Sequence, residues 1–220
     1  MKDADNFVDR LGQVDACAVS DALDKLGLTG VVTGLHRFST DRRIFGRVVT
    51  VKLEKDDGRA AAARHLSTAA IESARRGDVI VVEQRTGIDA AGWGGNLSLG
   101  AKLRGVAGVI VEGPTRDVDE GRIHDFPVFA RDHTSRTARG RIVESGTNVP
   151  ITVGDVAVSP GDYVVADGSA VVFVAESEIA RVLEIAEAIA TRESLMVDAL
   201  RKGTPISQVM NHTYETMLKR

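Results

Sequence analysis

"GVIVEGPTRDVDE", residues 108–120, joins an apolar run to an arginine and an aspartate. The β-branched run 109–111 predicts a buried strand that ends at the Gly-Pro pair of this stretch. Arg116 and Asp117 follow directly. Ligands of open α/β sheets collect outside the carboxyl ends of the strands. The stretch therefore predicts both the kind of fold and a candidate site at the end of a strand.

The segments before this stretch alternate between strand and helix patterns. The uninterrupted apolar run 78–83 is expected for a strand covered on both faces. The alanine-rich segment 60–77 has basic residues near its end, which is typical of a helix. Two further strands, at 45–53 and 106–112, and a helix at 96–104 complete a β-α-β-α-β order. This order favours a parallel layer with helices packed on it.

The flanking segments complete one domain. Residues 19–26 have helical apolar spacing, with Gly27 as a stop signal. After residue 113, "FPVFA", "GRIVES", "PITVGDVAVSPGDYVVAD" and "SAVVFVA" predict short strands divided by turns. A long amphipathic helix is predicted at about 176–202, and a short one after it. We expect a single mixed α/β domain, 1–220, with a C-terminal helical extension at about 176–220.

Composition limits the classes of partner. Hydrophobic residues make up 43% of the 220 residues and the net charge is −3, which is ordinary for a soluble globular protein and unlike a nucleic-acid binder. No apolar run approaches the roughly 20 residues that span a bilayer, and the first residues lack the apolar stretch of a secretory signal. We expect a cytoplasmic protein that binds neither nucleic acid nor membrane.

The first candidate motif is "GWGGN", residues 92–96, between a predicted strand and a predicted helix. Glycines allow close backbone approach to a ligand, and a helix start offers unpaired N–H groups to an anion. The dinucleotide fingerprint fails because Leu97 stands where a third glycine is required, and the P-loop pattern lacks its Lys and Ser/Thr. Two interpretations of this motif are left: a backbone site for an anion the size of a carboxylate, or a tight strand-to-helix connection that binds no ligand.

The second candidate is the pair Arg116-Asp117. The planar guanidinium can grip a carboxylate or a ketone oxygen, and the aspartate can hold Mg²⁺ or a similar cation. The alternative is that Asp117 or Thr115 caps a short helix, with Asp119 and Glu120 in its first turn. That alternative gives Arg116 no role.

Other reactive residues carry little signal. No two histidines are spaced i, i+4, so a histidine-based metal site is not predicted. Ser67 and Ser98 lack the G-x-S-x-G context of a serine hydrolase. The single cysteine, Cys17, excludes an internal disulfide and a Cys-based zinc cluster, and we predict it to be a small core residue.

Together these segments resemble one known family. "VSDALDKLG", "FGRVVTV", "RRGDVIVVE", "GWGGNLSLGAKLRGVAGVIVEGPTRDVDE", "FPVFARD" and "VSPGDYVVADGSAVVFV" follow one another as in RraA-like proteins, over about 19–203. This family includes the 4-hydroxy-4-methyl-2-oxoglutarate aldolases, which are class II pyruvate aldolases. The resemblance implies an α/β/β/α sandwich of the swivelling (phosphohistidine-like) type with mixed sheets. It also implies trimers or hexamers with active sites at subunit boundaries.

The resemblance further implies roles for individual residues. Backbone amides of Gly94, Gly95, Asn96 and Leu97 would bind the carboxylate of a pyruvate unit. Arg116 would contact the keto oxygen and stabilise an enolate. Asp117 would bind Mg²⁺ or Mn²⁺, directly or through water. Glu193, on the long C-terminal helix of an adjacent subunit, would contribute as well.

One position departs from the family pattern. Aldolase members usually carry an acid where this chain has Gly95, so a carboxylate for proton transfer or water positioning is expected to be missing. Decarboxylation removes no hydroxyl proton and should tolerate this loss better than retro-aldol cleavage. Asn96 offers a polar group at the next position, but its role stays open.

Two functions follow from the resemblance. The first is a divalent-metal-dependent lyase that cleaves or decarboxylates a pyruvate-derived 2-oxo acid, as an aldolase, an oxaloacetate decarboxylase or both. The second is a regulatory protein of the ribonuclease-inhibitor type that acts through protein contacts. A methyltransferase has no support, because no nucleotide-cofactor loop is present. Residues 55–65 are candidates for the pocket wall, and Asp57 and His65 within them could reach a ligand.

Overall fold

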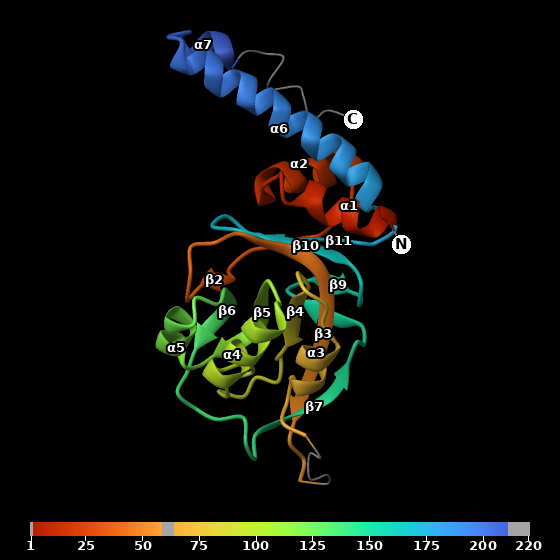
Figure 1. The fold of residues 1–220 in the computed structure, drawn as a ribbon, viewed down its shortest axis with the longest axis vertical. Coiled ribbons are helices and arrows are strands. Elements are labelled where there is room, and N and C mark those ends of the chain that lie inside the picture. Colours follow the sequence, from red (N-terminus) through yellow and green to blue (C-terminus); the bar gives the residue numbers. More distant parts are fainter. Residues whose placement is uncertain (1, 59–63, 211–220) are drawn as a thin grey trace.

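The computed structural model describes residues 2–58 and 64–210 of the chain (Figure 1). Within them, nine strands form one mixed, curled sheet in the order β1-β11-β10-β3-β4-β5-β6-β2, and β7 is added to β3. Helices cover both outer faces of this curled sheet (Figure 1). The mixed α/β class is thereby confirmed, whereas the swivelling type of sandwich remains a prediction.

Strand β3 (Ile44–Lys55) connects the two halves of the sheet. Its first residues pair antiparallel with β10 (Tyr163–Ala166), and the following ones pair parallel with β4 (Val79–Glu83). Its last residues pair antiparallel with β7 (Ile142–Thr147). Because a twisted strand of this length can change partners along its course, both halves of the sheet are built on a single strand.

The parallel half carries the candidate site. Strands β4, β5 (Gly108–Thr115) and β6 (Val128–His133) run parallel, and β2 (His36–Arg37) closes the edge antiparallel to β6. Three short helices accompany these strands: α3 (Thr68–Ser73), α4 (Gly95–Arg104) and α5 (Val118–Ile123). The predicted strand-helix alternation is confirmed here.

The antiparallel half carries the terminal helices. Strands β10, β11 (Val171–Val174) and β1 (Val31–Val32) form its sheet, and β8 (Ile151–Val153) with β9 (Val156–Val158) forms a separate hairpin. The helices on this half are α1 (Lys2–Leu11), α2 (Ala16–Leu26), α6 (Ile179–Arg201) and α7 (Ile206–Val209). The far end of α6 extends beyond the body of the molecule (Figure 1).

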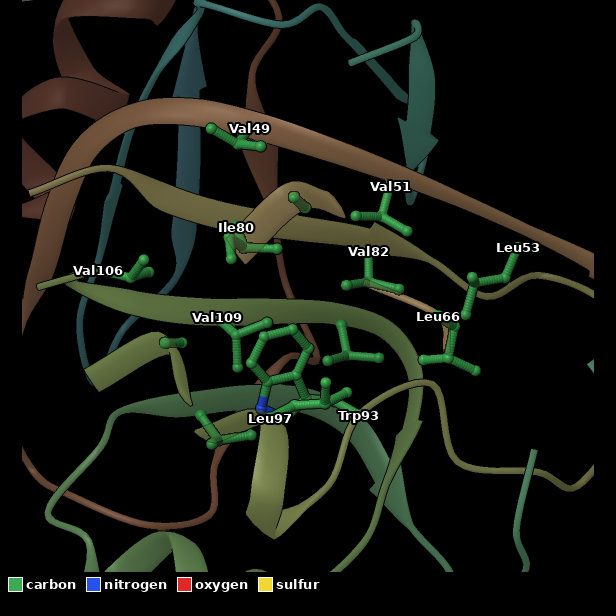
Figure 2. Close-up of a cluster of buried hydrophobic side chains, with 14 of the residues drawn as sticks. Val49, Val51, Leu53, Leu66, Ile80, Val82, Trp93, Leu97, Val106 and Val109 are labelled. Atoms are coloured by element: carbon green, nitrogen blue, oxygen red, sulfur yellow. The ribbon is translucent and has the colours of Figure 1, made fainter. Parts of the chain in front are cut away.

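Three buried clusters hold the layers together. One lies between the two halves of the sheet and includes Val81, Ile110 and Phe173. Another packs α1, α2 and α6 on β10 and β11. The third packs α3, α4 and the loop around Trp93 on β3, β4 and β5, and Figure 2 shows Trp93 beside Val109 and Leu97. The candidate loop is therefore part of a hydrophobic core.

Three details of the sequence-based prediction were wrong. Strand β5 does not stop at residue 113 but continues to Thr115, with an irregular register beside Pro114, where a residue without an N–H is tolerated. The helix predicted at 60–77 ends at Ser73 in its described part, since Ala74 is extended and Asp78 binds the next N–H; residues 59–63 lie outside the described chain. Cys17 is exposed because α2 buries the opposite face.

The other predicted helices agree closely. Gly27 ends α2 in the left-handed conformation, and α6 lies within the predicted helix. The predicted extension consists of α6 and, after a non-helical break at 202–205, the short α7; residues 211–220 lie outside the described chain. Among the described residues, no helix combines the length and the apolar character needed to cross a membrane.

Gly46 gives a test of the junction in β3. A Cβ at this position would lie 2.2 Å from the carbonyl oxygen of Gly77, a backbone atom that cannot rotate away. Gly46→Ala should therefore lower the free energy of unfolding by about 1–3 kcal/mol in urea titrations. Gly100→Ala in α4, where an added Cβ would meet no atom outside the helix's own backbone within 4 Å, is the matched control and should be neutral or stabilising. Equal stability of the two variants would contradict the packing described here.

Candidate active site at the carboxyl edge of the parallel strands

Parallel pairing of β4 and β5 brings the two candidate loops together. Glu83 and Glu112 are register partners near the ends of these strands. Beyond them the pairing resumes as a parallel bridge between Trp93 and Thr115, and the N–H of Arg116 donates to the Trp93 carbonyl at 3.0 Å. The glycine-rich loop and the Arg-Asp pair are thus joined by backbone hydrogen bonds, as their places after neighbouring strands predicted.

Trp93 anchors the glycine-rich loop. Its indole is 1% exposed and stacks on Phe126, with the ring centroids 6.3 Å apart. Its Nε1 donates to the Ser98 hydroxyl at 2.9 Å, and that hydroxyl donates to the Gly94 carbonyl at 3.2 Å. A buried indole with a satisfied N–H holds the loop in one place.

The Asp117 carboxylate connects the two loops. Its Oδ2 accepts the N–H of Gly95 at 3.0 Å, and its Oδ1 accepts from Arg116 Nε at 3.1 Å. Asp117 occupies the N-cap position of α5, but it has φ 56° and its side chain makes no capping hydrogen bond. The capping alternative therefore does not describe its carboxylate, which is directed to the glycine-rich loop instead.

The start of α4 presents backbone donors. The first N–H groups of a helix have no partner within the helix, and of these Gly95 donates to Asp117. The N–H groups of Asn96 and Leu97 have no recorded partner in the described part of the chain. Gly94 lets the loop pass close to the acid, since a Cβ there would lie 2.8 Å from Asp117 Oδ2. The arrangement can receive an anion.

A cavity of about 210 Å³ opens between these groups. The glycine-rich loop, Arg116 and Asp117 line one side of it, and His65, Leu66 and residues 137–139 line another. His65 and Arg139, which belong to no sequence motif, thus line the same cavity as Arg116 and Asp117. His65 was named only as a possible contact, and Arg139 was missed because it lies in a loop without a motif.

The wall that carries His65 is held in a strained turn. Ser67 is buried and has φ 64°, an uncommon conformation for a residue with a side chain. Its N–H donates to Glu144 Oε2 at 2.5 Å, and the hydroxyl of Thr147 donates to the other oxygen of Glu144. Strand β7 therefore fixes this side of the cavity.

Glu193 does not belong to this cavity within one chain. It lies on α6, which packs on the antiparallel half of the sheet beside α2. Partial burial and the nearby charges of Asp15 and Asp21 raise the pKa of Glu193. Burial and the charges of Asp24 and Asp15 likewise raise the pKa of Asp21. The surface between α2 and α6 therefore carries excess negative charge.

Comparison with known proteins places this arrangement in a family. The model of the RraA-like family, described as Aldolase/RraA, matches residues 16–173. The chain belongs to the RraA-like family. This match covers the glycine-rich loop, Arg116 and Asp117, and it confirms the resemblance recognised in the sequence.

Individual relatives share much of the chain. A Halalkalibacterium halodurans protein that carries the provisional name of 4-hydroxy-4-methyl-2-oxoglutarate aldolase is 30% identical over 187 residues, which is 83% of this chain and 82% of that protein. Protein DlpA of Legionella pneumophila is 25% identical over 211 residues, or 96% of this chain. The RraA-like chain spans only 34% of the length of DlpA.

Solved structures support the same fold. An uncharacterised Pseudomonas syringae protein superimposes with a TM-score of 0.84 and 26% identity, covering 94% of this chain and 98% of that one. RraAS2 of Streptomyces coelicolor, described as an unusual member of the RNase ES inhibitor RraA protein family, has a TM-score of 0.77 and 25% identity. It covers 86% of this chain and 94% of its own.

The raised pKa of Glu193 has a consequence for stability. A carboxyl group whose pKa is higher in the folded than in the unfolded chain destabilises the fold once pH exceeds its unfolded value of about 4.3. In an isolated subunit, where Glu193 faces no neighbouring cavity, Glu193→Gln should therefore raise the melting temperature at pH 7, and the gain should vanish below about pH 4, where both states are protonated. Thermal unfolding across pH tests this. A lower melting temperature at pH 7 would contradict it.

Proposed function

We propose that this RraA-like protein is a divalent-metal-dependent carbon-carbon lyase. It would cleave a 4-hydroxy-2-oxo acid, decarboxylate oxaloacetate, or do both, through a pyruvate enolate. The observation that carries the proposal is the convergence of Arg116, Asp117 and the amides at the start of α4 on one cavity. The name of the Halalkalibacterium halodurans relative supports the aldolase reaction.

The chemistry requires stabilisation of negative charge on one oxygen. Breaking a C–C bond next to a ketone leaves its electron pair on the enolate of pyruvate. The N–H groups of Asn96 and Leu97 would bind the pyruvate carboxylate at the start of α4. The Arg116 guanidinium would bind the keto oxygen, and fixed donors of this kind contribute several kcal/mol to catalysis. Because Asp117 accepts from Arg116 Nε, it orients that guanidinium.

The donor set around Asp117 suits Mg²⁺ or Mn²⁺. Among the described residues no group of three or more His, Cys, Asp or Glu side chains could hold a metal. Mg²⁺ commonly uses one or two carboxylates and keeps several waters, so a single anchoring carboxylate fits this ion better than zinc. Asp117 would hold the ion, which when bound supplies a Lewis acid for the enolate oxygen.

A second copy of the chain would complete the site. Glu193 lies on α6, on the other half of the sheet from the cavity, so it could reach only the cavity of a neighbouring subunit. The same part of α6 exposes Leu195 (66%) and Val197 (43%), apolar side chains that a neighbour would cover. Negative charge around Glu193 complements the cationic cavity. We therefore propose a trimer or hexamer with sites at subunit boundaries.

Arg116 and Asp117 provide the direct test. Arg116→Ala and Asp117→Ala should each lower pyruvate release from oxaloacetate and from 4-hydroxy-4-methyl-2-oxoglutarate by about 100-fold or more, since each removes stabilisation of the enolate. A coupled pyruvate assay measures this. Arg181→Ala, which removes a surface pair with Glu178 on α6, is the matched control and should keep wild-type rates. Full activity in both site variants would show that the site is elsewhere.

Metal removal tests the proposed cation. Exhaustive treatment with EDTA should abolish pyruvate release, and Mg²⁺ or Mn²⁺ should restore it. Asp117→Asn should weaken Mn²⁺ binding in calorimetric titrations, whereas Asp119→Asn, with an exposed carboxylate paired to Arg122, should not. Unchanged turnover of the chelated protein would exclude the metal.

The second candidate function is regulation of a ribonuclease. The likeness to RraAS2, described as a member of an RNase ES inhibitor family, favours it. In this case the protein would inhibit a ribonuclease by surface contacts and release no pyruvate. Inhibition that persists in Arg116→Ala, together with absence of turnover in the metal-loaded wild type, would support this function over the lyase.

A further inference from the structure

Glu120 lies against the glycine-rich loop, at the position of Gly95. A Cβ built on Gly95 would fall 1.8 Å from Glu120 Oε2 and 2.9 Å from the Cβ of Glu120. The side chain of Glu120 therefore occupies the space into which any side chain at residue 95 would extend. Any larger residue there would have to displace the glutamate.

The position of Glu120 follows from that of Asp117. Asp117 is the N-cap residue of α5 and Glu120 lies in the first turn, so both side chains lie at the end of α5 that meets the glycine-rich loop. Asp117 binds the N–H of Gly95, and Glu120 packs on the same glycine. Asp117 lines the cavity together with Gly95, and Glu120 is exposed beside that glycine.

The carboxylate of Glu120 is not used for folding contacts. Asp117 is held by a backbone N–H and a guanidinium, whereas no hydrogen bond or ion pair of the Glu120 carboxylate is recorded with any described residue. An acid in the first turn of α5 suits the helix dipole, but Asp119 satisfies that preference equally. The helix dipole does not explain why one of the two acids packs on Gly95.

We infer that Glu120 is the proton-transfer residue of the lyase proposed above, on which this inference rests. Its carboxylate takes the proton of the substrate's 4-hydroxyl group. The C3–C4 bond then breaks, C4 becomes a carbonyl carbon, and the electron pair forms the enolate of pyruvate. Glu120 returns the proton to C3, which becomes the methyl group of pyruvate. No proton is lost or gained overall, and Glu120 ends as it began.

This assignment changes the expectation for residue 95. The sequence alone indicated that a carboxylate was missing at the start of α4. In the folded chain α5 supplies one to the same place, so the protein is not limited to decarboxylation. Cleavage of a 4-hydroxy-2-oxo acid becomes available because a base can remove the hydroxyl proton.

The test compares two reactions in the full-length, Mg²⁺-loaded protein. Glu120→Gln should lower kcat for 4-hydroxy-4-methyl-2-oxoglutarate cleavage by about 100-fold or more. It should change oxaloacetate decarboxylation less than about threefold, since that reaction removes no hydroxyl proton and its enolate takes the proton at C3 from water. Asp119→Asn, which loses the same charge in the same helical turn, should leave both rates unchanged. Equal rates of aldol cleavage in Glu120→Gln and wild type would overturn the assignment.

Two further measurements test the Glu120 assignment: a double variant that moves the acid to residue 95, and the affinity for Mn²⁺. Glu120→Gly with Gly95→Asp should recover much of the cleavage rate that Glu120→Gly loses, because the Cβ of residue 120 no longer blocks residue 95 and the acid returns to the same space from α4. Mn²⁺ affinity in Glu120→Gln should match wild type; loss of that affinity would mean that Glu120 holds metal instead and would overturn the inference. Wild-type protein that only decarboxylates overturns the Glu120 assignment alone, whereas wild type without either activity overturns the lyase as well.

Discussion

The hydrogen bond from the Gly95 N–H to the Asp117 carboxylate unites two loops that follow neighbouring strands. It can form because β4 and β5 are parallel and in register up to Glu83 and Glu112, so both chains leave the sheet at the same edge. The same carboxylate orients Arg116. One partly buried hydrogen bond therefore fixes the distance between the start of α4, which can receive an anion, and the groups that would stabilise an enolate.

Glycine and strain are concentrated where these groups meet. Gly94 and Gly95 lack side chains because Asp117 and Glu120 fill the adjacent space. Asp117 itself has a left-handed conformation, which costs free energy in a residue with a side chain. Ser67, on the opposite wall, is in a similar conformation and is held by Glu144. The scaffold of buried β strands supplies the stability that such local strain requires.

The distribution of charge indicates how the family function would be completed. The cavity collects Arg116, Arg139 and His65 around one acid, whereas the surface between α2 and α6 gathers acids whose pKa values are raised. A protein seldom leaves carboxylates close together and partly buried without a function, since their mutual repulsion destabilises the fold. A neighbouring subunit that covers this surface would relieve the repulsion and supply an acid to the cavity.

The sequence by itself determined the strand-helix alternation, the glycine-rich loop, and the place of Arg116 and Asp117 at a strand end. These features depend on local patterns, namely β-branched runs, glycine spacing and alternation, which are read along the chain. Only the tertiary structure decided that Glu120 covers Gly95, that Arg139 lines the cavity, and that Cys17 is exposed. These outcomes depend on how loops and helices distant in sequence pack against one another. Hydrophobic periodicity along the chain does not specify that packing.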